Sequence, residues 1–243
     1  MPNQLAFLHG FMGEASDWDE VRAQLSEFET RAINIEVATD WQDTLHSIAN
    51  SLTSNSIVIG YSMGARLALG IALEFPKKCG GLIFISGNPG LESDEERDAR
   101  KIADEKVASR IEQFGVKPAT KKSFLNDWYR SSVFTSLPDE IRKQEIQRKL
   151  GRDANDWPAM LRVNSVSRQP NYWPRLNELS MPTLVVAGER DEKYKAITFR
   201  FAEAVVSNRV TSRVLENCGH MVHREKSAEL SHLIRNFIKQ HSR

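Results

Sequence analysis

The chain has 243 residues, 40% of them hydrophobic, and its 33 basic and 32 acidic side chains give a formal net charge of +1. This length and apolar content suffice for one domain with a sizeable core. The near-neutral charge argues against nucleic acid or an anionic membrane as the partner and favours a small molecule. The two cysteines, Cys79 and Cys218, lack paired spacing, which argues against a disulfide framework and a zinc site.

The N-terminus has no basic region followed by an apolar stretch, and no window approaches about 18 uninterrupted apolar residues. We therefore expect a soluble cytoplasmic protein, either a monomer or a small homo-oligomer, that works without a cofactor.

Short β-rich segments alternate with helical patterns over much of the chain, which is typical of a parallel sheet with helices on both faces. Several of these segments are nearly continuous apolar runs, as expected for strands buried on both faces. Six strands are predicted: Gln4–Leu8, Arg31–Val37, Ser56–Gly60, Gly81–Ser86, Thr183–Ala187 and Thr211–Leu215. The predicted fold class is α/β.

The alternation stops between Leu91 and Leu179, where the sequence becomes charged and helical. Ser93 and Glu96 have the spacing of a capping box, and apolar residues recur near helical spacing behind them. We expect residues 91–179 to form a helical cap inserted into a core of residues 1–90 and 180–243. Its expected place is over the C-terminal edge of the sheet, where open α/β sheets bind ligands.

Gly60–Tyr61–Ser62–Met63–Gly64 matches the G-x-S-x-G motif between a predicted strand and a predicted helix. The glycines permit a tight strand-to-helix turn that exposes Ser62. A serine hydroxyl needs an imidazole to take its proton and a carboxylate to orient that imidazole. Asp191 and His220 each follow a later strand, so Ser62, Asp191 and His220 occur in the order that is typical of α/β-hydrolase folds.

The glycine turn after the first strand completes this prediction, because that loop supplies one oxyanion donor in such folds and the residue after the nucleophile supplies the other. The donors are then the backbone N–H groups of Phe11 and Met63. Arg66 lies one helical turn after Ser62 and indicates an anionic substrate. His223 follows His220 by three residues, but this pair alone is no zinc signature, so no metal is expected.

Several segments resemble one family, the 2-succinyl-6-hydroxy-2,4-cyclohexadiene-1-carboxylate synthases of menaquinone and phylloquinone biosynthesis, often called MenH. The segments that carry the resemblance are Phe7–Phe11 with Trp18, Gly60–Arg66, Gly87–Leu91, Glu96–Arg100, Asp127–Tyr129, Val133–Phe134, Gln169–Pro170, Gly188–Tyr194 and Gly219–Glu225.

The resemblance implies a lyase of the α/β-hydrolase fold in which the triad serine acts as a base and triggers elimination of pyruvate. It implies that Arg66 and Arg100 hold substrate carboxylates, with Arg97 as a helper. It also implies that Tyr61, Trp128 and Phe134 line the pocket.

Two departures from the family leave alternatives open. Ala38–Gln42 replaces an Asp-Leu-Pro-Gly-His-Gly loop, and a later cap arginine of the family falls near Arg148, Lys149 and Arg152 without a clear equivalent. The first two antiparallel strands of the full fold are also expected to be missing. The alternatives are an esterase, thioesterase or carbon–carbon-bond hydrolase with Ser62 as nucleophile, or a ligand-binding module on the same scaffold.

Overall fold

A six-stranded parallel sheet forms the centre of the computed structural model, which describes residues 4–114, 119–206 and 209–241. The strands are β1 (Leu5–Leu8), β2 (Thr30–Ile33), β3 (Ser56–Tyr61), β4 (Cys79–Ile85), β5 (Thr183–Gly188) and β6 (Val210–Leu215). They lie in the order β2-β1-β3-β4-β5-β6, and every neighbouring pair is parallel. The predicted fold class and the six predicted strands are confirmed.

The second strand is shorter than predicted, because the chain leaves the sheet after Ile33. Beyond this point the backbone N–H of Ile35 donates to Nε2 of His9 at 3.0 Å rather than to a neighbouring strand. Asp40 then caps the next helix by accepting a hydrogen bond from the N–H of Asp43 at 2.9 Å. The unusual Ala38–Gln42 stretch therefore leads straight into a helix, and Trp41 begins that helix as a buried residue.

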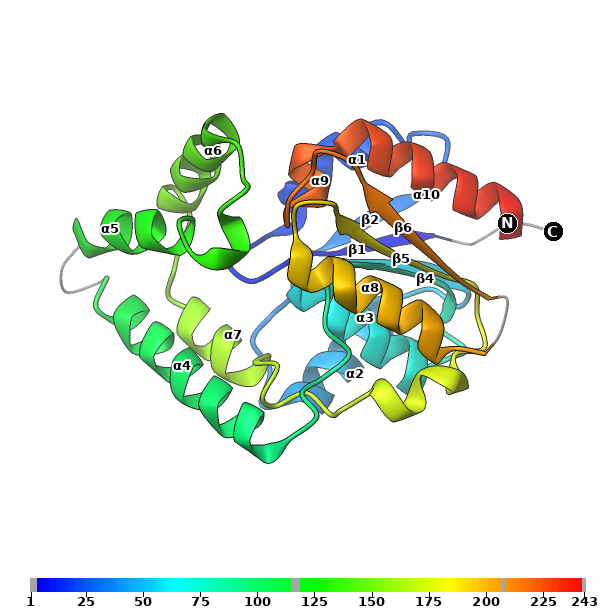
Figure 1. Ribbon diagram of the computed structural model, residues 1–243, viewed down its shortest axis with the longest axis horizontal. Helices are drawn as coiled ribbons and strands as arrows, with labels where there is room; N and C mark the ends of the chain where they lie inside the picture. Colours follow the sequence, from blue (N-terminus) through cyan, green and yellow to red (C-terminus); the bar gives the residue numbers. More distant parts are fainter. Residues whose placement is uncertain (1–3, 115–118, 207–208, 242–243) are drawn as a thin grey trace.

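Helices cover both faces of the sheet (Figure 1). One face carries α1 (Asp19–Ala23), α9 (Val222–Glu225) and α10 (Ser227–His241), and the other carries α2 (Trp41–Ser51), α3 (Met63–Glu74) and α8 (Glu192–Ala204). Successive strand residues point to opposite faces. Leu5 and Phe7 accordingly join the apolar cluster under α10, whereas Ala6 and Leu8 join the cluster under α3.

The segment between β4 and β5 is helical, with no strand among its described residues. It contains α4 (Asp94–Glu112), α5 (Ala119–Trp128), η2 (Ser132–Phe134), α6 (Asp139–Leu150), α7 (Trp157–Val163) and η3 (Trp173–Glu178). The capping box predicted at Ser93 and Glu96 is present at the start of α4. Helices α4 and α7 pack together, as do α5 and α6, and all four lie beyond one end of the sheet (Figure 1).

A buried carboxylate joins α6 to the core. Asp17, in η1 (Ala15–Trp18), accepts hydrogen bonds from Lys149 at 3.2 Å and from Arg148 at 3.1 Å, and it also pairs with Arg152. Burial opposes ionisation of Asp17, but Lys149 and Arg152 hold the pKa of its carboxyl well below the usual range. Charge pairing therefore fastens this part of the helical segment to η1.

Within the described residues, none of the helices is both long enough and apolar enough to cross a membrane.

Candidate active site

Ser62 occupies a strained turn between β3 and α3. Its backbone has φ 54° and ψ −110°, in a region that L-residues rarely adopt. A Cβ at Gly60 would collide with the carbonyl group of Gly64, and a Cβ at Gly64 would collide with the carbonyl oxygen of Leu8. The G-x-S-x-G glycines are therefore required by close backbone approach, and the turn lifts Ser62 out of the sheet.

The structure brings Ser62, His220 and Asp191 together in one hydrogen-bonded line. His220 Nε2 lies 3.4 Å from Ser62 Oγ, and His220 Nδ1 lies 2.6 Å from Asp191 Oδ2. Asp191 is the N-cap of α8, three residues after the end of β5, and His220 lies in the loop after β6. His220 and Asp191 are both buried. With Nδ1–H donated to the carboxylate, Nε2 is free to accept the serine proton.

A half-buried glutamate that the sequence analysis did not single out braces the histidine loop. The carboxylate of Glu225 accepts hydrogen bonds from the backbone N–H groups of Gly219 at 2.8 Å and Met221 at 3.0 Å, on either side of His220. Burial raises the pKa of Glu225. Its place in Gly219–Glu225, five residues after His220, was the only signal in the sequence.

The loop after β1 and the start of α3 each place one backbone N–H donor in the cavity that contains Ser62. Phe11 and Met63 both line the same cavity as Ser62, and among the described residues neither backbone N–H donates to another backbone group. His9 holds this loop, because its Nδ1 lies 2.8 Å from the carbonyl oxygen of Gly10 while its Nε2 accepts from Ile35. Burial lowers the pKa of His9 to about 4, so the ring stays neutral at pH 7.

A cavity of about 390 Å³ opens over Ser62 and His220. This volume is typical of sites for small molecules, which span roughly 300–1,000 Å³. Trp128 and Phe134 from the helical segment form part of its wall, as predicted, and the Phe134 ring contacts the His220 ring edge-on at 5.6 Å between centroids. Tyr194 from α8 lines the other side and packs against His220.

Arg66 lies in this cavity, and its hydrogen-bond partners within the described part of the chain are all neutral. Its Nη2 donates to the carbonyl oxygen of Asn164 at 2.6 Å and its Nη1 to Oε1 of Gln169 at 3.1 Å. Its guanidinium also lies 5.7 Å from the centre of the Trp41 ring. Burial and the nearby Arg100 lower the pKa of Arg66 to about 10, so it remains a cation at pH 7. Gln169, which the sequence analysis did not assign to the site, is fully buried and orients it.

Arg100 also lines the cavity, but it is paired with the carboxylate of Asp104 at 2.8 Å. The cavity therefore holds the predicted triad residues, both predicted oxyanion donors and two of the three predicted arginines.

Two predicted cavity residues lie elsewhere. Arg97 donates to the carbonyl oxygens of Leu91 and Gln169, each at 2.9 Å, and is not part of the cavity wall. Tyr61 is buried behind the site, between the rings of His220 and His223. The structure therefore does not bring Arg97 and Tyr61 to the cavity wall with the other candidates, because Arg97 donates to backbone carbonyls and the Tyr61 ring packs against His220.

The remaining cationic candidates and His223 also lie outside the cavity. Arg148, Lys149 and Arg152 all converge on Asp17. His223 packs against the rings of Trp18 and Tyr61, and burial lowers its pKa to about 3. Among the described residues, no group of three or more His, Cys, Asp or Glu side chains is arranged to hold a metal ion.

Comparison with known proteins gives a consistent set of relatives. The model of the Alpha/beta hydrolase family matches residues 5–233. The chain is 30% identical over 237 residues to the 2-succinyl-6-hydroxy-2,4-cyclohexadiene-1-carboxylate synthase of Citrobacter koseri, covering 92% of this chain and 89% of the relative. The synthase of Salmonella typhimurium is 31% identical over 246 residues, covering 94% of this chain and 92% of the relative.

Solved structures agree with these sequence relatives. The structure of MenH from S. aureus matches with a TM-score of 0.90 and 27% identity, over 100% of this chain and 96% of that chain. A thermophilic esterase from Thermogutta terrifontis matches with a TM-score of 0.73 and 20% identity, over 98% of this chain and 90% of that chain. The second likeness shows the fold alone.

Proposed function

The chain belongs to the Alpha/beta hydrolase family and, within it, to the 2-succinyl-6-hydroxy-2,4-cyclohexadiene-1-carboxylate synthases, and we propose that it is a lyase that eliminates pyruvate in menaquinone or phylloquinone biosynthesis. The proposed substrate is 2-succinyl-5-enolpyruvyl-6-hydroxy-3-cyclohexene-1-carboxylate. The main support for this substrate is that Ser62 and His220, which form a hydrogen-bonded triad with Asp191, lie in the same cavity as Arg66 and Arg100.

The charge of the cavity suits this substrate, which has a ring carboxylate, a succinyl carboxylate and an enolpyruvyl carboxylate. Arginine binds carboxylates through two parallel N–H donors, which fixes their orientation as well as their position. Among the residues that the structure describes, Arg66 has no carboxylate partner, so its cation is available to a ligand. A polyanion therefore gains a charge partner on entering the cavity.

The reaction follows from the bonding of the substrate. The hydrogen on ring carbon 2 is acidic because that carbon is next to the succinyl ketone. Ser62 takes this proton while its own hydroxyl proton passes to Nε2 of His220, which Asp191 holds in the required tautomer. The electron pair forms the C2–C3 double bond, the C3–C4 double bond moves to C4–C5, and the C5–O bond breaks. Pyruvate leaves as its enolate and is protonated on carbon, which balances the proton that His220 gives up as the triad returns to its starting state.

The backbone donors have a defined part in this scheme. Negative charge develops on the succinyl ketone oxygen as carbon 2 loses its proton, and the N–H groups of Phe11 and Met63 are the candidates to receive it. Trp128 and Phe134 cover the reacting ring and keep bulk water from the enolate. In this proposal Ser62 acts as a base and forms no covalent intermediate.

The test is a coupled assay of pyruvate release by the purified protein supplied with the upstream intermediate. We expect rapid release by the wild type, a loss of about 100-fold or more in Ser62→Ala, and a marked loss in Arg66→Ala. No release above background would refute the proposal. A burst with an aryl ester that leaves an acyl group on Ser62 would instead establish a hydrolase with Ser62 as nucleophile.

A further inference from the structure

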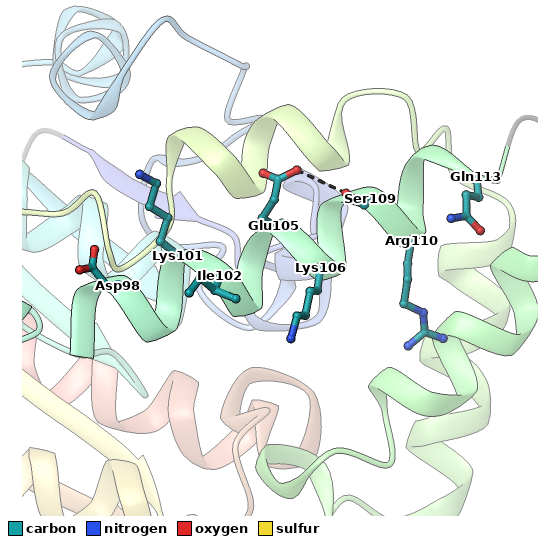
Figure 2. A pocket seen from close by; sticks show the side chains of 8 residues that line it. All are labelled: Asp98, Lys101, Ile102, Glu105, Lys106, Ser109, Arg110 and Gln113. Atoms are coloured by element: carbon teal, nitrogen blue, oxygen red, sulfur yellow. Dashed lines mark hydrogen bonds between the residues drawn. The ribbon is translucent and has the colours of Figure 1, made fainter. Parts of the chain in front are cut away.

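Asp104 is a buried carboxylate in the wall of the cavity, with 6% of its surface exposed. It lies on the inward face of α4, where Arg100, Ala103, Asp104 and Val107 all line the cavity. Figure 2 shows the side chains on another face of α4, including Asp98, Lys101 and Ile102, beside a second and more open hollow. Asp104 is therefore separated from the surface charges of its own helix.

Two hydrogen bonds fix the Asp104 carboxylate. Its Oδ1 accepts from Nε of Arg100 at 2.8 Å and its Oδ2 accepts from the hydroxyl of Ser165 at 2.6 Å. The Ser165 hydroxyl is also 2.7 Å from the hydroxyl of Ser167, and Ser165 follows α7. The carboxylate thus links α4 to the chain beyond α7 and is held from both sides.

This contact uses only one edge of the Arg100 guanidinium. Among the described residues, Asp104 is the sole hydrogen-bond partner of the Arg100 side chain, and the bond comes from Nε. The two Nη groups, which present parallel N–H donors, are left for a ligand. The Arg100 side chain is 42% exposed, so without this contact it would sample many rotamers in solvent.

We propose that Asp104 is a positioning residue, which with Ser165 holds Arg100 so that its Nη edge receives one carboxylate of the substrate. The inference rests on the proposed function, because it names the residue that prepares the second carboxylate site of the same cavity. This role of Asp104 also explains why a cavity that is proposed to bind a polyanion has a carboxylate in its wall. The Asp104 charge orients one guanidinium, whereas Arg66 is oriented by the neutral groups of Asn164 and Gln169.

The experiment compares Asp104→Asn, Arg100→Met and the double variant, with Asp98→Asn as the matched control. Asp98 is an exposed carboxylate on the same helix that does not line the cavity, so its replacement changes net charge equally. The measurements are KM and kcat for pyruvate release, and the Kd of 2-succinylbenzoate from quenching of tryptophan fluorescence. This dicarboxylate lacks the enolpyruvyl group and cannot react.

Loss of a charge-assisted carboxylate contact is expected to raise KM and Kd about 10- to 100-fold in Arg100→Met. In Asp104→Asn the rise is expected to be about 5- to 20-fold, with kcat within about twofold of wild type. Asp104→Asn should add nothing in the Arg100→Met background, because the positioned group is already gone. Asp98→Asn should match the wild type.

Ser165→Ala gives a milder second test, because it leaves the ion pair in place and removes one anchor of the carboxylate. It is expected to raise Kd about 2- to 5-fold. Melting temperatures identify any variant that is unfolded. An unchanged or lowered KM and Kd in folded Asp104→Asn would overturn the inference, as would full additivity with Arg100→Met.

The two proposals fail in different ways. If the wild type binds 2-succinylbenzoate but releases no pyruvate, the proposed function fails while the Kd series still decides the role of Asp104. If the wild type releases pyruvate and Asp104→Asn binds normally, only the role of Asp104 fails. A wild type that neither binds nor reacts would overturn both.

Discussion

Replacing Arg66 separates the charge of this residue from its geometry. Arg66→Met removes the cation and keeps an unbranched side chain, while Arg66→Lys keeps a cation but loses the planar pair of N–H donors. Arg66 is held at 2.6 Å and 3.1 Å by Asn164 and Gln169, so little of its freedom remains to be lost when a carboxylate binds. The substrate therefore meets a preorganised cation.

The expected rise in KM follows from the strength of one charge-assisted hydrogen-bonded contact. This strength is about 1.5–3 kcal/mol, which corresponds to about 10- to 150-fold in affinity. We expect Arg66→Met to raise KM by that factor. Arg66→Lys should retain part of the affinity and lie between Met and wild type. Arg66→Met leaves the acceptors of Asn164 and Gln169 without their donor, which is expected to lower the free energy of unfolding by about 1–3 kcal/mol.

The assay is steady-state pyruvate release at pH 7.5, where Arg66 is charged, with urea denaturation run in parallel to measure stability. If the KM of folded Arg66→Met stays within about threefold of wild type, the reasoning is refuted. The arginine would then be a structural brace between α3 and the segment after α7.

Three further predictions concern residues around the triad. Gly64→Ala places a Cβ against the carbonyl oxygen of Leu8, and we expect a loss of about 2–3 kcal/mol of stability on denaturation; a loss below about 0.5 kcal/mol would contradict the steric account. Glu225→Gln keeps the size of the side chain but replaces one of the two accepting oxygens with an NH2 group, so one of the two backbone bonds around His220 is lost and the other loses its charge. We therefore expect kcat to fall about 10-fold with KM little changed, and an equal change in both constants would speak against this role. His223 is buried with its pKa lowered to about 3, so the unfolded chain binds a proton on it below about pH 6.5 and the folded chain does not. The neutral His223 therefore contributes its full stabilisation above that pH, and the contribution is lost as pH falls toward 3, with about 2 kcal/mol lost by pH 5. Denaturation at pH 7 and pH 5 should show that the free energy of unfolding falls by about 2 kcal/mol less in His223→Gln than in the wild type.

The sequence sufficed to predict the sheet and the meeting of Ser62, Asp191 and His220. Ser62 and Asp191 follow the buried apolar strands β3 and β5, and His220 follows the partly exposed edge strand β6. The C-terminal ends of parallel strands lie along one edge of a sheet. This argument does not require the order of the strands in the sheet, because all parallel strands end at the same edge. The same reasoning located the loops of Phe11 and Met63.

The directions of side chains in the helical segment could not be predicted from the sequence. Arg97 and Arg100 are three residues apart on α4, yet Arg97 is bound to backbone carbonyls and Arg100 reaches the cavity. The choice depends on where the chain around Gln169 passes, which is a contact between residues far apart in sequence.

The ion-pair partners of the cations near position 150 could not be predicted from the sequence either. A buried carboxylate is costly unless it is paired, so Asp17 gathers Arg148, Lys149 and Arg152 around it. Nothing in the local sequence of α6 indicates that a carboxylate from η1 would lie beneath it. The assignment of these cations to the cavity or to the core therefore required the structure.

The central claim is that bond cleavage is an elimination triggered by Ser62, and it is tested most directly by following pyruvate and the ring product in the same reaction. Elimination forms a conjugated cyclohexadiene, which absorbs in the near ultraviolet, together with one pyruvate. Hydrolysis of the enol ether would release pyruvate but leave a ring alcohol without the second double bond. We predict equal rates and equal amounts of diene and pyruvate for the wild type, and a loss of both signals by about 100-fold or more for Ser62→Ala. Pyruvate without diene would contradict the account and identify a hydrolase.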